Sequence, residues 1–163
     1  MEKDQFISII NDNQNLIYKI CCSYCSNTEN RKDLQQEILI QLWNSFLNFD
    51  GRVKISTWIY RIALNTAISF YRSDSKHTDK NLSLDNSLIS LSNFEYVPEP
   101  DENIVILYKF IENLKEMDKA LILLYLEDNS YKDIAEIIGI SETNVATKIN
   151  RIKKILKEQF SNY

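Results

Sequence analysis

The 163-residue chain contains only two glycines and two prolines, a scarcity that restricts its possible folds more than any other feature. Glycine and proline supply most tight turns, so a turn-rich all-β fold is disfavoured, as is a glycine-rich loop that binds phosphate. Hydrophobic residues make up 44% of the chain and charged residues 26%, the balance of a soluble protein with a packed core rather than a disordered one. We therefore expect an all-α protein.

No apolar run approaches the roughly 20 residues that a membrane-spanning helix requires. The segment beginning at Met1 lacks the basic and apolar regions of a secretory signal peptide. We expect a cytoplasmic protein that does not insert into a membrane.

Apolar residues recur at three- and four-residue spacing in the N-terminal half, which is the periodicity of helices packed on one face. The pattern predicts helices over about 3–25, with a break left open near 11–15, over about 29–48, and from 55 to about 72. The third helix has the clearest apolar stripe, formed by Ile55, Trp58, Ile59, Ile62, Ala63, Thr66 and Phe70. The same periodicity leaves a second group outside the stripe: Tyr60, Arg61, Leu64, Asn65 and Arg72.

Periodicity fades between residues 73 and 100, a stretch that is rich in Ser, Asn and Asp and contains both prolines. A loop of this length inside one compact domain is unusual, so we interpret the stretch as a flexible linker between two small helical domains. The predicted boundaries are 1–73 for the first domain, 74–100 for the linker and 101–163 for the second domain.

The second domain is predicted to contain helices over about 101–113 and 115–127, followed by a helix-turn-helix. Ser130 can cap a short helix, Gly139 can end it in the left-handed conformation, and Ser141 can cap the next helix. The inner stripe of that last helix is Val145, Ile149, Ile152 and Leu156. Tight hairpins in helical bundles also combine a glycine with a capping serine, so these residues alone do not identify a DNA-binding motif.

The opposite face of the last helix is polar and suits the major groove of DNA. It carries Thr143, Asn144, Thr147, Lys148 and Arg151. Asn can pair with adenine, Arg or Lys with guanine, and Thr can supply a methyl or hydroxyl group, so this face favours DNA binding over a bundle hairpin. The helix continues with lysines expected to face the phosphates: Lys153, Lys154 and Lys157.

Charge is distributed unevenly, although its net value is only −4. Residues 51–80 include six basic and two acidic residues, and residues 141–157 include five basic and one acidic residue. Residues 85–128, between these zones, include three basic and ten acidic residues. Because polyanion binding depends on local charge, two separate contacts with a phosphate backbone are allowed, although solvated helix faces would give the same pattern.

The cysteines cluster at Cys21, Cys22 and Cys25, and His77 is the only histidine. These residues cannot complete a four-ligand zinc site, so we expect no metal and no other cofactor. A redox pair at Cys22 and Cys25 stays open, but an apolar, helix-periodic stretch favours cysteine as a small hydrophobic residue. No histidine or acidic cluster accompanies the thiols, so we do not expect an enzyme.

Three motifs, in order along the chain, resemble the extracytoplasmic-function (ECF) type of sigma factor, within the sigma-70 family of bacterial RNA polymerase. Residues 33–37 (DLQQE), followed by Trp43, resemble the region 2 helix that docks on the clamp coiled coil of the polymerase β′ subunit. Residues 49–51 (FDG) and 56–65 (STWIYRIALN) resemble the segment that captures and melts the −10 promoter element. Residues 126–141 (LEDNSYKDIAEIIGIS) resemble region 4, which binds the −35 element.

The resemblance implies a factor that binds the polymerase core, at the β′ clamp and the β subunit, and directs promoter-specific initiation without catalytic residues. It assigns core binding to Asp33, Gln36 and Glu37. It assigns the −10 element to Arg52, Lys54, Ser56, Tyr60, Arg61, Asn65 and Arg72. The −35 element is assigned to the polar face defined above: Thr143, Asn144, Thr147, Lys148 and Arg151. Family members are commonly held inactive by an anti-sigma factor, which is a further expected partner.

The chemistry of residues 52–72 suits melting, which requires aromatic groups that stack on unpaired bases and cations that hold the single strand. Tyr60 and Tyr71 are the candidate exposed aromatic residues, whereas Trp58 is expected in the core. Asn65 either contacts an extruded base or is simply solvated. At about 3.3 Å per residue the linker reaches at most about 90 Å, or about 26 base pairs, so one chain can hold both elements. Its acidity suits a basic polymerase channel, although a disordered spacer would have the same composition.

Two other functional classes remain open from sequence alone. A stand-alone DNA-binding regulator would use only the helix-turn-helix and would bind duplex DNA without polymerase. A helical adaptor would not bind DNA at all.

Overall fold

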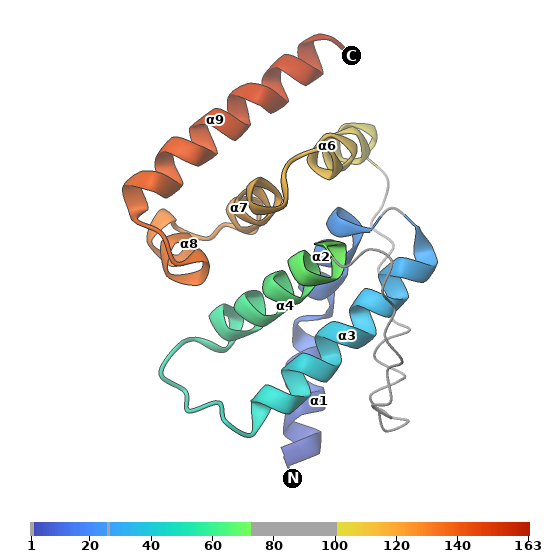
Figure 1. The fold of residues 1–163 in the computed structure, drawn as a ribbon, viewed down its shortest axis with the longest axis vertical. Helices are drawn as coiled ribbons and strands as arrows, with labels where there is room; N and C mark the ends of the chain where they lie inside the picture. The colour runs from blue at the N-terminus through green and yellow to red at the C-terminus, as the bar shows by residue number, and fades with distance from the viewer. Residues whose placement is uncertain (1, 26, 73–100) are drawn as a thin grey trace. The chain divides into compact units, whose positions relative to one another are not determined.

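The computed structural model describes residues 2–25, 27–72 and 101–163, and every regular element in these ranges is an α-helix. The helices belong to two compact units, Met1–Val97 and Pro98–Tyr163, which Figure 1 shows in the order of the chain. The all-α prediction is therefore confirmed. None of the helices in the described ranges combines the length and the hydrophobicity that crossing a lipid bilayer would require. The predicted linker, 74–100, lies outside the described residues, and the exact domain boundaries stay predictions.

The described part of the first unit contains α1 (Glu2–Asp12), α2 (Gln14–Tyr24), α3 (Thr28–Phe46) and α4 (Ile55–Arg72). Helices α2, α3 and α4 all contact one another, and α3 and α4 lie side by side (Figure 1). The break left open near residues 11–15 is present at Asn13, whose side-chain Nδ2 donates to the carbonyl of Ile9 at 2.8 Å. The first apolar stretch therefore forms two helices rather than one.

Aliphatic and aromatic side chains from all four helices form the core of the first unit. The largest fully buried ones are Phe6, Ile10, Ile20, Leu34, Ile38, Leu39, Leu42 and Ile59. Burying one side chain of this size contributes about 1.5–3 kcal/mol, so the unit is stabilised mainly by these apolar stripes.

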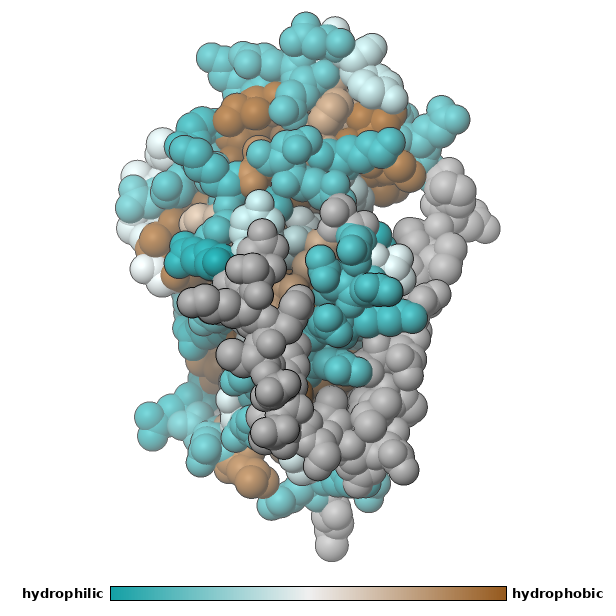
Figure 2. Space-filling model, turned by 45° about the vertical axis from the view of Figure 1, so that its right-hand side comes forward, coloured by the Kyte–Doolittle hydropathy of each residue, from teal (hydrophilic) through white to brown (hydrophobic). Residues whose placement is uncertain are grey.

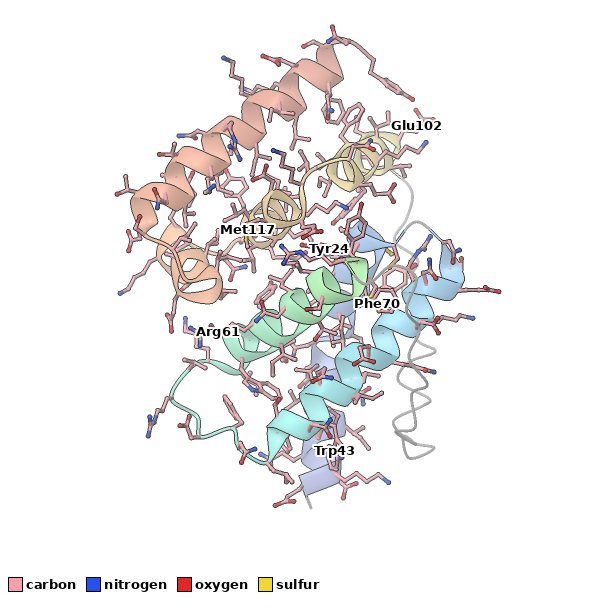
Figure 3. All side chains as sticks on the ribbon, viewed as in Figure 1. Tyr24, Trp43, Arg61, Phe70, Glu102 and Met117 are labelled. Carbon is pink, nitrogen blue, oxygen red and sulfur yellow. The ribbon has the colours of Figure 1, made fainter. Side chains whose placement is uncertain are left out.

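An aromatic cluster at one end of the core joins α1, α3 and α4. The ring of Phe6 lies 5.0 Å from that of Trp43 in an edge-on arrangement and 5.3 Å from that of Phe46. The ring of Trp58 lies 6.2 Å from Phe46 and 5.1 Å from Phe49, in the segment before α4. Figure 3 shows Trp43 near the C-terminal end of α3. The cluster thus fixes the segment that leads into α4 against the helices.

Two expectations for α4 are wrong: Tyr60 and Leu64, predicted outside the stripe, are only 6% and 2% exposed. The buried face of α4 is turned relative to the predicted stripe, since Tyr60, Leu64 and Ala67 are buried at three- and four-residue spacing beside Ile59 and Ala63. The rest of the stripe, including Trp58, which was expected in the core, is only half-buried: Ile55, Trp58, Ile62, Thr66 and Phe70.

The second unit contains α6 (Glu102–Glu112), α7 (Glu116–Leu126), α8 (Tyr131–Ile138) and α9 (Glu142–Ser161) among its described residues. The long α9 contacts each of the other three. The predicted inner stripe of α9 is buried along its whole length, at Val145, Ile149, Ile152 and Leu156. In α8 the buried residues are Ile134 and Ile137, and Ile138 is half-buried.

Two serine caps and a left-handed glycine define the ends of the helices in the predicted helix-turn-helix. The Ser130 hydroxyl accepts a hydrogen bond from the backbone N–H of Asp133 at 3.1 Å, and the Ser141 hydroxyl accepts one from that of Asn144 at 3.2 Å. Gly139 ends α8 with φ +85° and ψ +35°, the left-handed conformation that costs glycine little. The two caps and the glycine, all predicted from sequence, are confirmed.

The thiols at the end of α2 differ in their surroundings. Cys21 and Cys25 are buried, Cys22 is half-buried, and none of the three forms a disulfide within the described part of the chain. Burial, reinforced by the neighbouring thiols, raises the pKa of Cys21 well above its usual range. The Arg31 side chain contacts Cys22 Sγ at 3.9 Å and donates through Nε to the Cys25 carbonyl at 3.1 Å, which ties the start of α3 to the end of α2. The expected hydrophobic role is confirmed for Cys21 and Cys25.

Replacing Gly139 by alanine should lower the free energy of unfolding by about 1–2 kcal/mol, because an L-residue is strained at this φ. No atom lies within 4 Å of a Cβ built at Gly139, so the cost arises from the backbone alone. Gly139→Asn should lose less, since asparagine tolerates the left-handed region. Denaturant unfolding followed by circular dichroism measures both variants, and an alanine variant as stable as the wild type would contradict this account.

Native-state alkylation should modify Cys22 first and Cys21 last, because the thiolate is the reactive form and the Cys21 thiol is both buried and held protonated. Iodoacetamide labelling followed by peptide mass spectrometry gives the three rates. In denaturant the rates should converge. Preferential labelling of Cys21 in the folded protein would mean that α2 is packed differently.

Candidate nucleic-acid interface

The helix-turn-helix presents one exposed polar face of α9, opposite the buried stripe. Of the predicted −35 residues, the structure exposes Thr143, Asn144, Thr147 and Arg151. Lys148, the fifth, is half-buried at the edge of this face. The structure therefore brings four of the five predicted residues together on an accessible surface.

Asn150 is an exposed residue of the same face that sequence reasoning missed. It lies three residues after Thr147 and four before the exposed Lys154, so these side chains follow one row along the helix. Helical spacing alone predicts Asn150 on this face, because it follows Thr143 and Thr147 at intervals of four and three residues. The choice of residue types typical of base contacts left it out. The candidate surface is therefore wider than predicted.

Arg151 is held by an ion pair within the second unit. Its Nη2 donates to Asp118 Oδ1 at 2.8 Å and to Asp118 Oδ2 at 3.1 Å. Asp118 lies in the first turn of α7, where the helix dipole also stabilises a negative charge. The Arg151 side chain is 54% exposed and that of Asp118 only 11%, so the guanidinium remains accessible while the carboxylate is largely covered.

Lys153 was expected to face the phosphates together with Lys154 and Lys157. In the structure it is half-buried and lies against an aromatic ring of the same unit. Its Nζ lies 4.1 Å from the ring centroid of Tyr125, in a cation–π arrangement. A side-chain hydrogen bond with Tyr125 raises the pKa of Lys153. Because Tyr125 belongs to α7 and Lys153 to α9, this contact joins the two helices.

The predicted −10 residues lie on α4 and on the segment before it. Asn65 and Arg72 are exposed and Arg61 is half-buried. Their spacing of four and seven residues places them on one face of α4, and Figure 3 shows Arg61 in the N-terminal half of this helix. Tyr60, as described above, is buried instead.

The segment before α4 is exposed and locally ordered. Arg52 and Lys54 are exposed, and Ser56 is half-buried in the first turn of α4. The Asp50 carboxylate accepts the Arg52 backbone N–H at 3.1 Å and pairs with Arg52 Nε at 2.9 Å. This pair is open to water, so it shapes the turn but contributes little stability.

The predicted core-binding residues share one face of α3. Asp33, Gln36 and Glu37 are all half-buried and lie three and four residues apart, away from the buried Leu34 and Ile38. The Glu37 carboxylate accepts a hydrogen bond from the side chain of Gln41 at 3.0 Å, one turn further along the helix. The structure thus brings these three residues together on one surface.

The surface also carries apolar side chains. Figure 2 shows hydrophobic areas between largely hydrophilic ones on the face in view. Large hydrophobic residues exposed in the second unit are Ile104, Val105, Met117, Leu126, Phe160 and Tyr163. Within residues 2–25, 27–72 and 101–163, no cluster of His, Cys, Asp or Glu is suited to hold a metal ion.

Comparisons with known proteins agree with this arrangement. Residues 9–77 match the family model for sigma-70 region 2, and residues 104–156 match that for sigma-70 region 4. The chain is 29% identical to the sigma factor YlaC of Bacillus subtilis, over 82% of this chain and 79% of YlaC. It is 26% identical to the ECF sigma factor SigW of the same organism, over 97% of this chain and 90% of SigW.

Two further comparisons extend the result. The chain is 30% identical to the ECF sigma-E factor of Escherichia coli K12, over 76% of this chain and 70% of that protein. Its fold matches the sigma factor RpoE of Bartonella quintana, solved in complex with the anti-sigma factor NepR, with a TM-score of 0.71 at 17% identity, covering 96% of this chain and 97% of that one. The two family matches in this order, together with relatives of one kind that the chain matches over 70–90% of their length, show that the chain belongs to the ECF group of the sigma-70 family, the sigma factors that direct RNA polymerase to promoters.

Proposed function

We propose that this sigma factor divides its work between its two units. The first unit binds the polymerase core and the −10 element, and the second binds the −35 element. The observation that carries the proposal is that each assigned set, apart from the buried Tyr60, lies on a surface distinct from the core of its unit, on α3, on α4 with the segment before it, and on α9. The factor acts in the cytoplasm, beside the polymerase, and contributes binding energy rather than catalytic groups.

The core-binding proposal rests on the α3 face that carries Asp33, Gln36 and Glu37. Two carboxylates and an amide within one turn provide acceptors for basic or amide side chains of a partner helix. The polymerase β′ clamp is the proposed partner. The β subunit is proposed to contact the second unit, where apolar residues are exposed.

The −10 proposal rests on cations around an exposed helix face. Arg52, Lys54, Arg61 and Arg72 supply positive charge for a single strand, and Ser56 and Asn65 supply hydrogen-bonding groups. Stacking on unpaired bases requires an accessible ring. Tyr71 is 48% exposed and Tyr60 only 6%, so Tyr71 is the better-placed stacking residue.

The −35 proposal rests on α9, which presents Thr143, Asn144, Thr147 and Arg151 to solvent. A helix of this kind inserts its N-terminal half into the major groove, where such side chains distinguish bases. Lys148, at the edge, is proposed to contact the phosphate backbone. Asn150 joins the reading face.

Regulation by an anti-sigma factor is part of the proposal. The structurally similar RpoE was solved bound to the anti-sigma factor NepR. The exposed apolar residues of the second unit suit a protein partner of this kind.

The deciding experiment combines the full-length protein with core polymerase and selects transcripts from a library of random upstream DNA. A sigma factor should yield transcripts whose upstream sequences share two separated elements. Core polymerase alone is the control. Tight binding to free duplex DNA without any binding to polymerase would instead establish a stand-alone regulator.

Glu37→Lys should weaken holoenzyme formation at least about tenfold, because charge reversal removes an acceptor and introduces repulsion at the proposed dock. Glu29→Lys is the matched control: it makes the same charge reversal at an exposed position of α3, eight residues away. Binding of each variant to core polymerase is measured by fluorescence anisotropy, with the melting temperature as a check on folding. Equal holoenzyme formation by both variants and the wild type would contradict the assignment of polymerase binding to this face of α3.

A further inference from the structure

The Asp118–Arg151 ion pair connects the candidate reading face to a helix that carries none of the assigned residues. Arg151 belongs to α9 and Asp118 to α7, 33 positions earlier in the chain. Asp118 is one of few charged residues buried in the described structure. A largely covered carboxylate beside a surface that must approach phosphates weakens DNA binding unless it performs another task.

The geometry leaves most of the guanidinium available. Both oxygens of Asp118 are bound by Nη2 of Arg151, at 2.8 and 3.1 Å. An arginine has five N–H donors, and those on Nε and Nη1 are not used by Asp118. With 54% of the side chain exposed, these donors can reach an external acceptor while Nη2 stays fixed. The carboxylate therefore orients the group without consuming it.

Orientation matters because a free arginine side chain populates many rotamers, and ordering it opposes the formation of any base contact. Asp118 removes this cost in advance, since it is itself buried in a helix that contacts α9. The Asp118–Arg151 pair also has no net charge. It therefore favours directed hydrogen bonds to a base over general attraction to the phosphate backbone of DNA.

We propose that Asp118 is a positioning residue that determines base preference at the upstream element by holding Arg151 in its reading orientation. This inference rests on the proposed function, in which α9 reads the −35 element. It adds a residue of α7 to the determinants of specificity. Arg151 touches the base, and Asp118 acts only through Arg151.

The test compares holoenzymes that contain the full-length wild type, Asp118→Asn, Arg151→Ala and the double variant. Each holoenzyme selects DNA from a library randomised over the upstream element, and sequencing gives the preference at every base pair. Arg151→Ala should reduce preference at one or two adjacent base pairs by about 5- to 100-fold, the range for an arginine contact with guanine. Asp118→Asn should reduce preference at the same base pairs by at least about fivefold. In the Arg151→Ala background it should have no further effect.

Two variants control for charge and shape. Glu112→Gln removes one exposed negative charge from α6 and should leave the preferences unchanged. Asp118→Glu keeps the carboxylate and should retain most of the preference. A loss as complete as in Asp118→Asn would show that a carboxylate at this position is not what holds Arg151 in its reading orientation, and would overturn the proposal. Melting temperatures verify that each variant is folded.

The outcomes separate the two proposals. A wild-type holoenzyme with no upstream preference would overturn the assigned function of α9 and this inference with it. A selective wild type whose preference survives Asp118→Asn, but not Arg151→Ala, would overturn only the positioning role. An effect of Asp118→Asn that persists without Arg151 would overturn it equally.

Discussion

The burial of one aliphatic stripe on α9 is the contact on which the second unit depends. Val145, Ile149, Ile152 and Leu156 pack inward, and α6, α7 and α8 all contact this helix. Because a helix that buries one face must turn the opposite face outward, the same packing that stabilises the unit presents Thr143, Thr147 and Asn150 to solvent. Stability and the proposed DNA recognition are thus two results of one periodic pattern.

In the first unit, too, the burial of one helix face leaves another face exposed. The α3 stripe of Leu34, Ile38 and Leu42 is buried, which leaves the proposed polymerase dock on another face of the helix. At the end of α3, the aromatic cluster supports the segment that leads into α4 through the contact between Phe49 and Trp58. The exposed cations of that segment are therefore held next to a packed core, although their own contacts are weak and local.

The features predicted well from sequence are those decided by residues close in the chain. The caps at Ser130 and Ser141 and the left-handed Gly139 follow from short-range chemistry, and the buried stripe of α9 follows from helical spacing. The predictions that failed concern features decided by residues far apart in the chain. Periodicity identified α4 as a helix but not the direction of its buried face, which depends on how neighbouring chain segments pack around it, so Tyr60 and Leu64 were misplaced. The partners of Arg151 and Lys153 come from α7, and no spacing rule links such distant positions.

These long-range partners change the electrostatics of the second unit. Five basic residues occupy positions 141–157, but Arg151 is neutralised by Asp118 and Lys153 lies over Tyr125. In the proposed mode of −35 binding, three lysines of this segment, at 148, 154 and 157, would meet phosphates, which corresponds to the release of only about three counterions on duplex binding. We therefore expect an isolated unit of this kind to bind DNA weakly at cellular ionic strength. Promoter occupancy would then depend on the polymerase to which the factor is attached, and a dissociated copy would leave the chromosome largely unoccupied.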